Sequence, residues 1–429
     1  MEGMCRNGLA VLLLLVSSVS GVGAGSERGG DRPVFRVTQD AGGDFSGNTG
    51  EAIRAALDRV RQAGGGTVIL AAGTFWLEKA LDLSGLSNAA LVGDPGSRLV
   101  LAPQVRARTV GAVEAGARQV RVRDPAGLSP GCRIEILAPG PTRVTPAGKE
   151  HAVPYMTASV RTVDGQMLTL ERALGAPVPE GVDVIRVTNA VTLRGAGSNL
   201  LLSGLDIDLN RDAWPIPPRN HTVHCGVFVS GPYSYDKGPT APPVERLRIV
   251  NCTIRNAHHR GIAWYSVVDS AVAGCTIENT GAEGIDFDHF SLRCHAVGNT
   301  LRRCRNLELN DASYCTVSGN TMEDCGEGIV VWQWCTQADL NVENVLSGNR
   351  LVRVGRYGVR LGEGADRNIV VQNSIVNPGK AAVRVAGKGN LVTGNRFVSC
   401  SGPGIEDTGA GTVTAGNERV NGGRPDGTP

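Results

Sequence analysis

The sequence CHAVGNTLRRCRNLELNDASYCTVSGNTMEDC at residues 294–325 contains the unit that decides the fold. Within it, Gly298-Asn299-Thr300-Leu301 returns 21 residues later as Gly319-Asn320-Thr321-Met322. From about residue 200 onward the chain repeats this unit every 21 to 24 residues, with occasional insertions. A unit of about three short strands cannot bury its apolar face alone, so successive units must stack on one another. The repeat predicts an all-β solenoid, a parallel β-helix.

Stacked coils lie about 4.8 Å apart, so residues at equivalent positions form columns along the solenoid. Asn344, Asn368 and Asn390 fall in one column, where their side chains can hydrogen-bond from coil to coil. Cys294 and Cys315 share another column. Because the Cα–Cβ bonds of stacked residues run parallel, we expect these cysteines to pack as buried thiols rather than to form a disulfide.

The composition agrees with a β-rich protein with many turns. The 429 residues include 58 glycines, and only 4% are aromatic. With 43 basic and 41 acidic residues the formal net charge is +2, which gives no electrostatic case for binding nucleic acid or an anionic membrane. After the N-terminal segment no stretch reaches the roughly 18 apolar residues of a membrane span. We expect a monomer.

The patterns divide the chain into five segments: a signal peptide (1–24), an N-terminal cap with the first coils (25–104), a β insertion domain (105–187), parallel β-helix repeats (188–420) and a flexible tail (421–429). The first segment has the charge, apolar run and small residues of a secretory signal, which predicts export to the periplasm or the extracellular space. Ile53, Leu57 and Val60 form one helical stripe, typical of a helix that caps an open solenoid end. Alternating strands predict that the inserted domain is small and antiparallel.

The start of the predicted solenoid resembles a known group of proteins. Its opening motifs are Gly43-Asp44-Phe45, Glu51-Ala52-Ile53-Arg54, Gly64-Gly65-Gly66-Thr67-Val68 and Ala72-Gly73-Thr74-Phe75. Together they resemble the opening of the pectate-lyase superfamily, which relatives of glycoside hydrolase family 28 share, and the coils at 200–417 resemble the generic right-handed β-helix repeat. The resemblance implies a right-handed parallel β-helix and a polysaccharide substrate. It does not imply one reaction, because this fold hosts hydrolases, lyases, epimerases and non-enzymes.

Short catalytic motifs indicate which enzymes of this fold the sequence resembles. The Asn-Thr-Asp, Gly-His-Gly and Arg-Ile-Lys motifs of polygalacturonases are absent from the sequence. By contrast, Asp286-Phe287-Asp288-His289 distantly resembles the Asp-Pro-His motif of mannuronan C5-epimerases, without its proline and with an added aspartate.

One face of the predicted solenoid gathers polar and aromatic side chains. Consecutive coils align Ile285-Asp286-Phe287-Asp288-His289 with Leu307-Glu308-Leu309-Asn310-Asp311, and alternation turns the apolar residues of both strands inward. The alignment predicts an exposed patch of outward-facing side chains: Tyr265, Asp286, Asp288, Glu308, Asn310 and Trp332. His289 and Asp311 stack at the end of the two strands. Insertions that begin after Ile207, Val229 and Trp334 flank this patch, as functional loops on a rigid scaffold do.

The two neighbouring carboxyl groups suggest acid–base chemistry. Asp286 and Glu308 lie one coil apart, so both do not ionise easily and one pKa should rise. A protonated carboxyl beside an ionised one is the arrangement that glycoside hydrolysis needs, with Asp288 or Asp311 as base or nucleophile. His289 can act as acid or base near neutral pH.

Other residues of the patch suggest binding roles. A calcium ion held by Asp286, Asp288 and Glu308 is a second explanation of the clustered charge, and no other cofactor is expected. The expected substrate contacts are Tyr265 and Trp332 through their rings, together with Asn310, His259, Arg260 and, farther along the Asp286 column, Arg360.

Three functions fit these patterns. The favoured one is cleavage of glycosidic bonds in a polysaccharide, either by hydrolysis or by β-elimination of a uronate. The elimination would use Arg360, His289 or a lysine as base, with calcium or an arginine neutralising the substrate carboxylate. The second is a uronate C5-epimerase, which inverts a carbon without breaking the chain. The third is a non-catalytic glycan-binding or structural solenoid, in which the patch is a solvated strand face with incidental charges.

Overall fold

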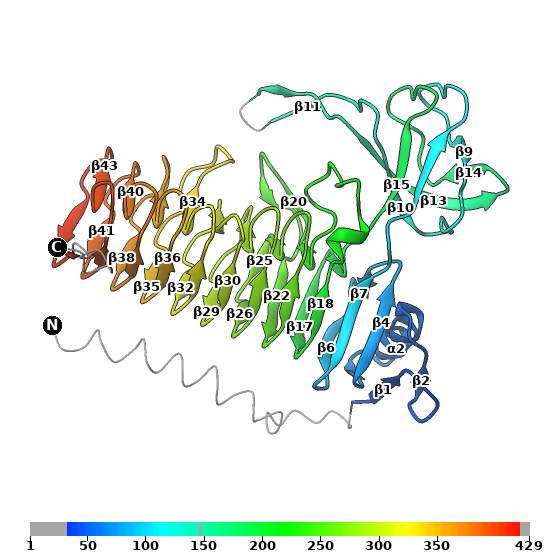
Figure 1. Cartoon of the computed structure of the whole chain (residues 1–429), viewed down its shortest axis with the longest axis horizontal. Coiled ribbons are helices and arrows are strands. Elements are labelled where there is room, and N and C mark those ends of the chain that lie inside the picture. Colours follow the sequence, from blue (N-terminus) through cyan, green and yellow to red (C-terminus); the bar gives the residue numbers. More distant parts are fainter. Residues whose placement is uncertain (1–31, 146–147, 421–429) are drawn as a thin grey trace, which may run out of the picture. The chain divides into compact units, whose positions relative to one another are not determined.

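The computed structural model describes residues 32–145 and 148–420. Their strands coil into a right-handed parallel β-helix with three long sheets, so the predicted fold class is confirmed (Figure 1). The predicted signal peptide and the predicted tail lie outside the described residues. Within the described ranges, no helix combines the length and the apolar character that a membrane span requires.

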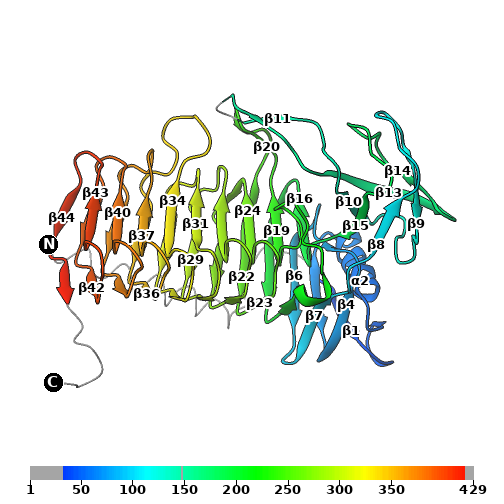
Figure 2. The same ribbon diagram turned by 45° about the horizontal axis from the view of Figure 1, so that its top comes forward.

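Each coil contributes one strand to each of the three sheets, and Figure 2 shows the stacked coils from a second angle. The fourteen-stranded sheet consists of β1 (Val34–Thr38), β2 (Phe45–Ser46), β3 (Gly66–Leu70), β6 (Ser87–Gly93), β17 (Gly197–Ser203), β22 (Val244–Val250), β25 (Val267–Val268), β26 (Ala271–Ala273), β29 (His295–Val297), β32 (Thr316–Ser318), β35 (Val345–Ser347), β38 (Ile369–Val371), β41 (Leu391–Thr393) and β44 (Val413–Ala415). The eleven-stranded sheet consists of β4 (Gly73–Leu77), β7 (Ser97–Leu101), β18 (Asp206–Asp208), β23 (Thr253–Arg255), β27 (Thr276–Glu278), β30 (Thr300–Arg302), β33 (Thr321–Glu323), β36 (Arg350–Val352), β39 (Ser374–Val376), β42 (Arg396–Val398) and β45 (Glu418–Val420).

The ten-stranded sheet carries the predicted site. It consists of β5 (Leu81–Asp82), β16 (Val191–Arg194), β19 (Val227–Ser230), β24 (Ile262–Tyr265), β28 (Ile285–Asp288), β31 (Leu307–Asn310), β34 (Ile329–Trp332), β37 (Val359–Leu361), β40 (Val383–Val385) and β43 (Ile405–Asp407). The inward side chains of all three sheets form one continuous apolar core, because every strand turns alternate residues toward the axis.

The corners of the coils explain the Gly-Asn landmark of the repeat. Gly298 and Gly319 have φ angles of 63°, in the left-handed region that glycine enters without strain. The asparagine that follows each glycine is buried and belongs to a ladder. Asn320 Oδ1 accepts hydrogen bonds from the backbone N–H (2.9 Å) and the Nδ2 (3.0 Å) of Asn299, and Asn349 repeats both contacts toward Asn320. The ladder satisfies buried backbone groups where the chain turns.

The predicted asparagine and cysteine columns are both present. Asn344 donates to Asn368 Oδ1, and Asn368 in turn donates to Asn390 Oδ1. The cysteines of the described residues are all free and buried, which agrees with the expected thiols. In one stacked pair, the backbone N–H of Cys252 lies 3.4 Å from the sulfur of Cys275.

The N-terminal end is covered by helix α2 (Gly50–Gln62), as expected for the cap. Thr49 is its N-cap residue, and its side chain accepts from the backbone N–H of Glu51. Ile53, Leu57 and Val60 are fully or almost fully buried against the first coils. The helix thereby covers the apolar end of the core, which would otherwise face water.

The inserted antiparallel domain is a small closed barrel between β7 and β16. Its strands are β8 (Arg106–Thr109), β9 (Gln119–Arg123), β10 (Arg133–Ile136), β13 (Met156–Asp164), β14 (Met167–Leu170) and β15 (Asp183–Val187), with a hairpin of β11 (Arg143–Val144) and β12 (Glu150–His151). The barrel has its own apolar core. It also holds a loop of the solenoid, because the Glu135 carboxylate accepts from the backbone N–H groups of Arg219 (2.6 Å) and Asn220 (2.9 Å).

Candidate functional site

The predicted carboxylate column is present in the ten-stranded sheet. Asp286 on β28 pairs directly with Glu308 on β31, while Ile285 and Phe287 turn into the core. The same column continues through Val330 and Arg360. The period of the repeat therefore predicted the correct register and the correct face of the strands.

The prediction that this patch is exposed is wrong. Asp286 is 0% exposed, Asp288 2%, Glu308 5%, Tyr265 4% and Asn310 5%, and only Trp332 is half-buried. The reason is that the insertions cover the strand face instead of standing beside it. One covering loop contains the short hairpin of β20 (Tyr233–Ser234) and β21 (Gly238–Pro239).

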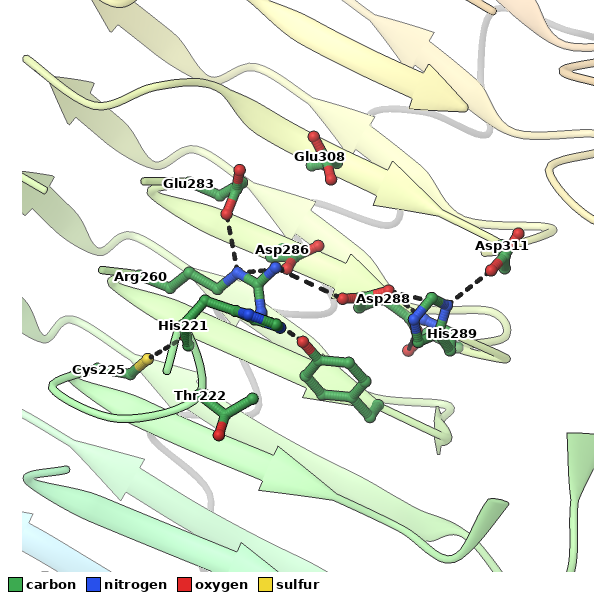
Figure 3. A network of polar contacts seen from close by, with 12 residues as sticks. His221, Thr222, Cys225, Arg260, Glu283, Asp286, Asp288, His289, Glu308 and Asp311 are labelled. Carbon is green, nitrogen blue, oxygen red and sulfur yellow. Dashed lines mark hydrogen bonds and ion pairs between the residues drawn. The ribbon is translucent and has the colours of Figure 1, made fainter. Parts of the chain in front are cut away.

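Arg260, predicted as a substrate contact, is a buried residue at the centre of the cluster (Figure 3). Its Nε lies 2.8 Å from Glu283 Oε2 and 2.9 Å from Asp286 Oδ2. Arg260 Nη1 donates to the hydroxyl of Tyr265, and Arg260 Nη2 lies 3.7 Å from Asp288 Oδ2. The guanidinium thus supplies positive charge to Asp286 and Asp288, two of the three acidic residues for which a calcium ion was considered.

Tyr265 is correspondingly not a surface platform for a sugar ring. Its hydroxyl is held by Arg260, and its ring stacks on that of Tyr233 with a centroid separation of 6.0 Å. The buried ring also packs against Phe228 at 5.4 Å. Tyr265 therefore supports the floor of the cluster.

The pKa values of the clustered carboxyls shift in opposite directions: that of Glu283 is lowered, whereas those of Asp286 and Glu308 are raised. Burial would raise the pKa of Glu283, but the charge and hydrogen bond of Arg260 bring it below its usual value. Burial raises the pKa of Asp286 well above its usual value, against the effect of Arg260 and with the help of Asp288 and Glu308. Burial and the charge of Glu283 raise the pKa of Glu308 to about 7.

The hydrogen bonds agree with this division of charge. The Nε–H of Arg260 donates to Glu283, and neither carboxyl oxygen of Asp286 has a hydrogen bond to another described residue. Glu308 accepts from Asn306 Nδ2 at 2.9 Å. A buried carboxyl that has an ion-pair contact but no hydrogen bond is uncommon in a core that serves structure alone.

At the end of the same strand, His289 and Asp311 form a tight pair. His289 Nδ1 lies 2.6 Å from Asp311 Oδ2 and 3.1 Å from Asp288 Oδ1. The backbone N–H groups of Trp334 (2.9 Å) and Cys335 (3.1 Å) donate to Asp311 and fix its carboxylate. Because a carboxylate only accepts, the neutral imidazole carries its proton on Nδ1 and leaves Nε2 free to take another.

Tyrosines surround the imidazole of His289. The ring centroids of Tyr235, Tyr265 and Tyr233 lie 5.1, 5.6 and 5.8 Å from that of His289. Tyr235 is 44% exposed, and burial still raises its pKa, so its phenol stays protonated at neutral pH. The pair and the tyrosines place a proton acceptor beside a proton donor.

Two predicted substrate contacts have structural partners elsewhere. His259 Nε2 lies 2.8 Å from the carbonyl oxygen of Pro218 and so contacts one covering loop. Arg360 lies two strands beyond Glu308 and pairs with Glu327 at 3.1 Å. Arg360 is therefore not brought together with Asp286 or His289.

Glu283 and Cys335 were missed from the sequence. Glu283 could have been recognised from the repeat. A Gly-Ile pair recurs at the start of the strands, and the residues that precede it share one column: Arg260, Glu283 and Glu327. Aligning that position would have placed Arg260 beside Glu283. Cys335 lies in an insertion, where no period predicts its neighbours.

His289, Asp311 and Cys335 also form a set of possible metal ligands. One donor atom from each lies within 4.8 Å of the others, and nitrogen with sulfur suits a transition metal. However, the Asp311 oxygens already accept hydrogen bonds from His289, Trp334 and Cys335, and burial and Asp311 raise the pKa of the Cys335 thiol. The hydrogen bonds account for the arrangement without an ion.

Comparison with known proteins agrees with this fold. The sequence profile of a family described as "Periplasmic copper-binding protein (NosD)" matches residues 234–377 and 294–418, which is less than half of the chain. No curated protein matches the sequence.

Several solved structures share the architecture at low sequence identity. The A-module of the mannuronan C-5 epimerase AlgE6 from Azotobacter vinelandii is 14% identical over 86% of this chain and 91% of its own, with a TM-score of 0.51. DFA-IIIase from Arthrobacter chlorophenolicus A6, without its lid, is 11% identical over 90% of both chains, with a TM-score of 0.51. The Agl-KA catalytic domain is 12% identical over 94% of this chain and 70% of its own, with a TM-score of 0.50. The resemblance inferred from sequence is thus confirmed for the fold: the chain is a right-handed parallel β-helix protein.

Proposed function

We propose that this protein is an exported enzyme that acts on a uronate-containing polysaccharide, and that His289 removes the proton at C5 of the uronate. The observation that carries the proposal is the 2.6 Å contact between His289 Nδ1 and Asp311, which fixes the imidazole and leaves Nε2 as a base. The similar fold of the mannuronan epimerase module and the distant motif resemblance around His289 support the choice of substrate class.

The reaction we favour is β-elimination. His289 Nε2 takes the C5 proton, the electron pair of that C–H bond forms a double bond between C4 and C5, and the C4–O4 bond breaks. The departing oxygen takes a proton, which Tyr235 supplies because its phenol is protonated and its ring adjoins His289. The reaction needs no water and no oxidant, and it leaves an unsaturated sugar at the new chain end.

Epimerisation is the second candidate, because it begins with the same proton abstraction. It differs in that a proton returns to the opposite face of C5 and the chain stays intact. Hydrolysis by Asp286 and Glu308 is less well supported. The reason is that Arg260 already contacts Asp286.

The test is a panel of polygalacturonate, polymannuronate and polyguluronate, with dextran as a neutral control. Elimination predicts new ultraviolet absorbance from unsaturated ends, whereas epimerisation predicts changed NMR spectra at constant chain length. His289→Ala should lower kcat by about 100- to 10,000-fold, the range expected for loss of a positioned acid or base.

The matched control is His295→Ala, since His295 lies on β29 of a different sheet and should not affect kcat. If His289→Ala retains full activity on a substrate that the wild type converts, His289 is not the base. If the wild type converts none of the uronates, the non-catalytic reading of the solenoid takes precedence.

A further inference from the structure

A cavity of about 310 Å³ lies where the barrel, helix α2 and the first coils meet. Its lining contains four cationic side chains and two acidic ones: Arg54, Lys79, Arg133, Arg194, Glu78 and Asp82. Arg133 comes from β10 of the barrel and Arg194 from β16 of the ten-stranded sheet. The two arginines therefore reach the cavity from parts of the chain that fold around separate cores.

Two of these cations, Arg133 and Arg194, have no direct ion-pair partner among the described residues, although the charges of Glu135 and Asp82 act to raise their respective pKa values. Within residues 32–145 and 148–420, neither Arg133 nor Arg194 forms an ion pair, and their guanidinium groups donate no hydrogen bond to the protein. Burial lowers the pKa of both side chains, and the charge of Arg194 lowers that of Arg133 further. Arg194 is nevertheless exposed, and its guanidinium carbon lies 4.8 Å from the centre of the Phe228 ring. The N–H donors of both arginines thus remain available to an anion in the cavity.

The cavity lies on the same face of the sheet as the candidate site. Thr192, which lines it, pairs with Phe228, which pairs with Ala263, which pairs with Asp286. Three strand spacings correspond to about 14 Å along this face. Arg194 belongs to the neighbouring column, which runs through Ser230 and Tyr265 to Asp288.

A covering loop also joins the two places. Val223 lines the cavity, and the same loop contains His221 and Thr222 beside Arg260 in Figure 3. Glu135 of the barrel holds that loop through the backbone of Arg219 and Asn220. Because Phe228, Ala263 and Tyr265 on the intervening strands are buried, a polysaccharide that reaches both His289 and the two arginines would pass over this loop.

We propose that this cavity is a binding subsite for an acidic sugar unit, whose carboxylate Arg133 and Arg194 hold together. The choice of a uronate rests on the proposed function. Two planar guanidinium groups suit a carboxylate, because each presents paired N–H donors that match its two oxygens. The subsite gives the inserted barrel a role, since the barrel contributes one of the two arginines.

The test measures binding separately from catalysis. Oligogalacturonate and oligomannuronate are titrated against the His289→Ala protein and against the same protein with Arg133→Ala and Arg194→Ala, by calorimetry at low and moderate salt. We expect Kd to rise at least about tenfold when the charge-assisted hydrogen bonds are lost. Binding should also depend less on salt.

The matched control is Arg248→Ala, an exposed arginine on β22 of another sheet, which should leave Kd unchanged. Arg133→Lys with Arg194→Lys keeps both charges but loses the paired donors, so an intermediate Kd is expected even if the alanine variant folds poorly. In the active enzyme, the lysine pair should raise KM while kcat stays within about twofold.

Unchanged uronate binding in both double variants overturns the subsite, even if His289 proves to be the base. Binding of dextran sulfate but of neither uronate also overturns it. Conversely, arginine-dependent uronate binding by a protein that converts none of the uronates supports the subsite while the proposed reaction fails.

Discussion

The ten-stranded sheet presents two very different outer faces along one solenoid. On β24, β28 and β31 the outward side chains are buried and include Tyr265, Asp286 and Glu308. On β40 and β43 the column of Asp286 and Glu308 continues with Arg384 and Glu406, which are partly exposed and lie 3.7 Å apart in an ordinary surface pair. The strands are equivalent, so the difference comes from the insertions that cover one region and leave the other open. In this protein the repeat determines where the outward side chains lie, and the loops determine whether those side chains are buried and so set their electrostatic environment.

The largest expected effect comes from removing the central cation of the covered region. Arg260→Met leaves the buried Glu283 with only the exposed Arg305 as a counter-charge, and we expect a loss of about 3–5 kcal/mol in unfolding free energy. Arg384→Met in the open region should cost less than about 1 kcal/mol, as exposed pairs do. Chemical denaturation of the two variants checks the contrast, and equal losses would contradict it.

The next effect depends on pH. The pKa of Glu308 is about 7 in the folded protein and near 4.3 in an unfolded chain, so the folded state holds its proton over a wider range. The contribution of this group to stability is therefore fully present below about pH 4 and falls by up to about 3 kcal/mol as pH rises toward 7.

Glu308→Gln should remove this fall, because a glutamine keeps an oxygen for Asn306 but does not ionise. Thermal unfolding at pH 5 and pH 8 measures the difference, with Glu406→Gln in the open region as control. A wild-type protein whose stability does not fall over this range, or a variant with an unaltered fall, contradicts the assignment.

The smallest expected difference is between two rungs of the asparagine ladder. Asn320→Ala and Asn373→Ala each remove contacts to the next asparagine, and each should cost about 1–3 kcal/mol. Because the ladder lies away from the covered face, the two losses should agree within about 0.5 kcal/mol, as equivalent sites do. Unfolding measurements that separate the two by more would show that the covering loops also affect the ladder side.

The site residues that lie on the repeated strands could be placed from the sequence, whereas the contribution of the inserted loops could not. Asp286 and Glu308 were placed side by side because both lie on strands of the repeat. Their burial could not be predicted, since it depends on loops around Tyr233 and Trp334 whose paths have no period. The pairing of Arg260 with Glu283 lies between these cases, because both residues occupy a repeated position whose role as a column was overlooked.

The stacked thiols can be used to measure local unfolding of the solenoid. Cys252 and Cys275 lie in the core with no disulfide, so an alkylating reagent reaches them only after neighbouring coils separate. The rate at which each sulfur is alkylated therefore measures how often the coils around that sulfur separate by local unfolding. It also follows that the chain can reach its final state without oxidative folding catalysts, because none of these sulfurs needs a bonded partner.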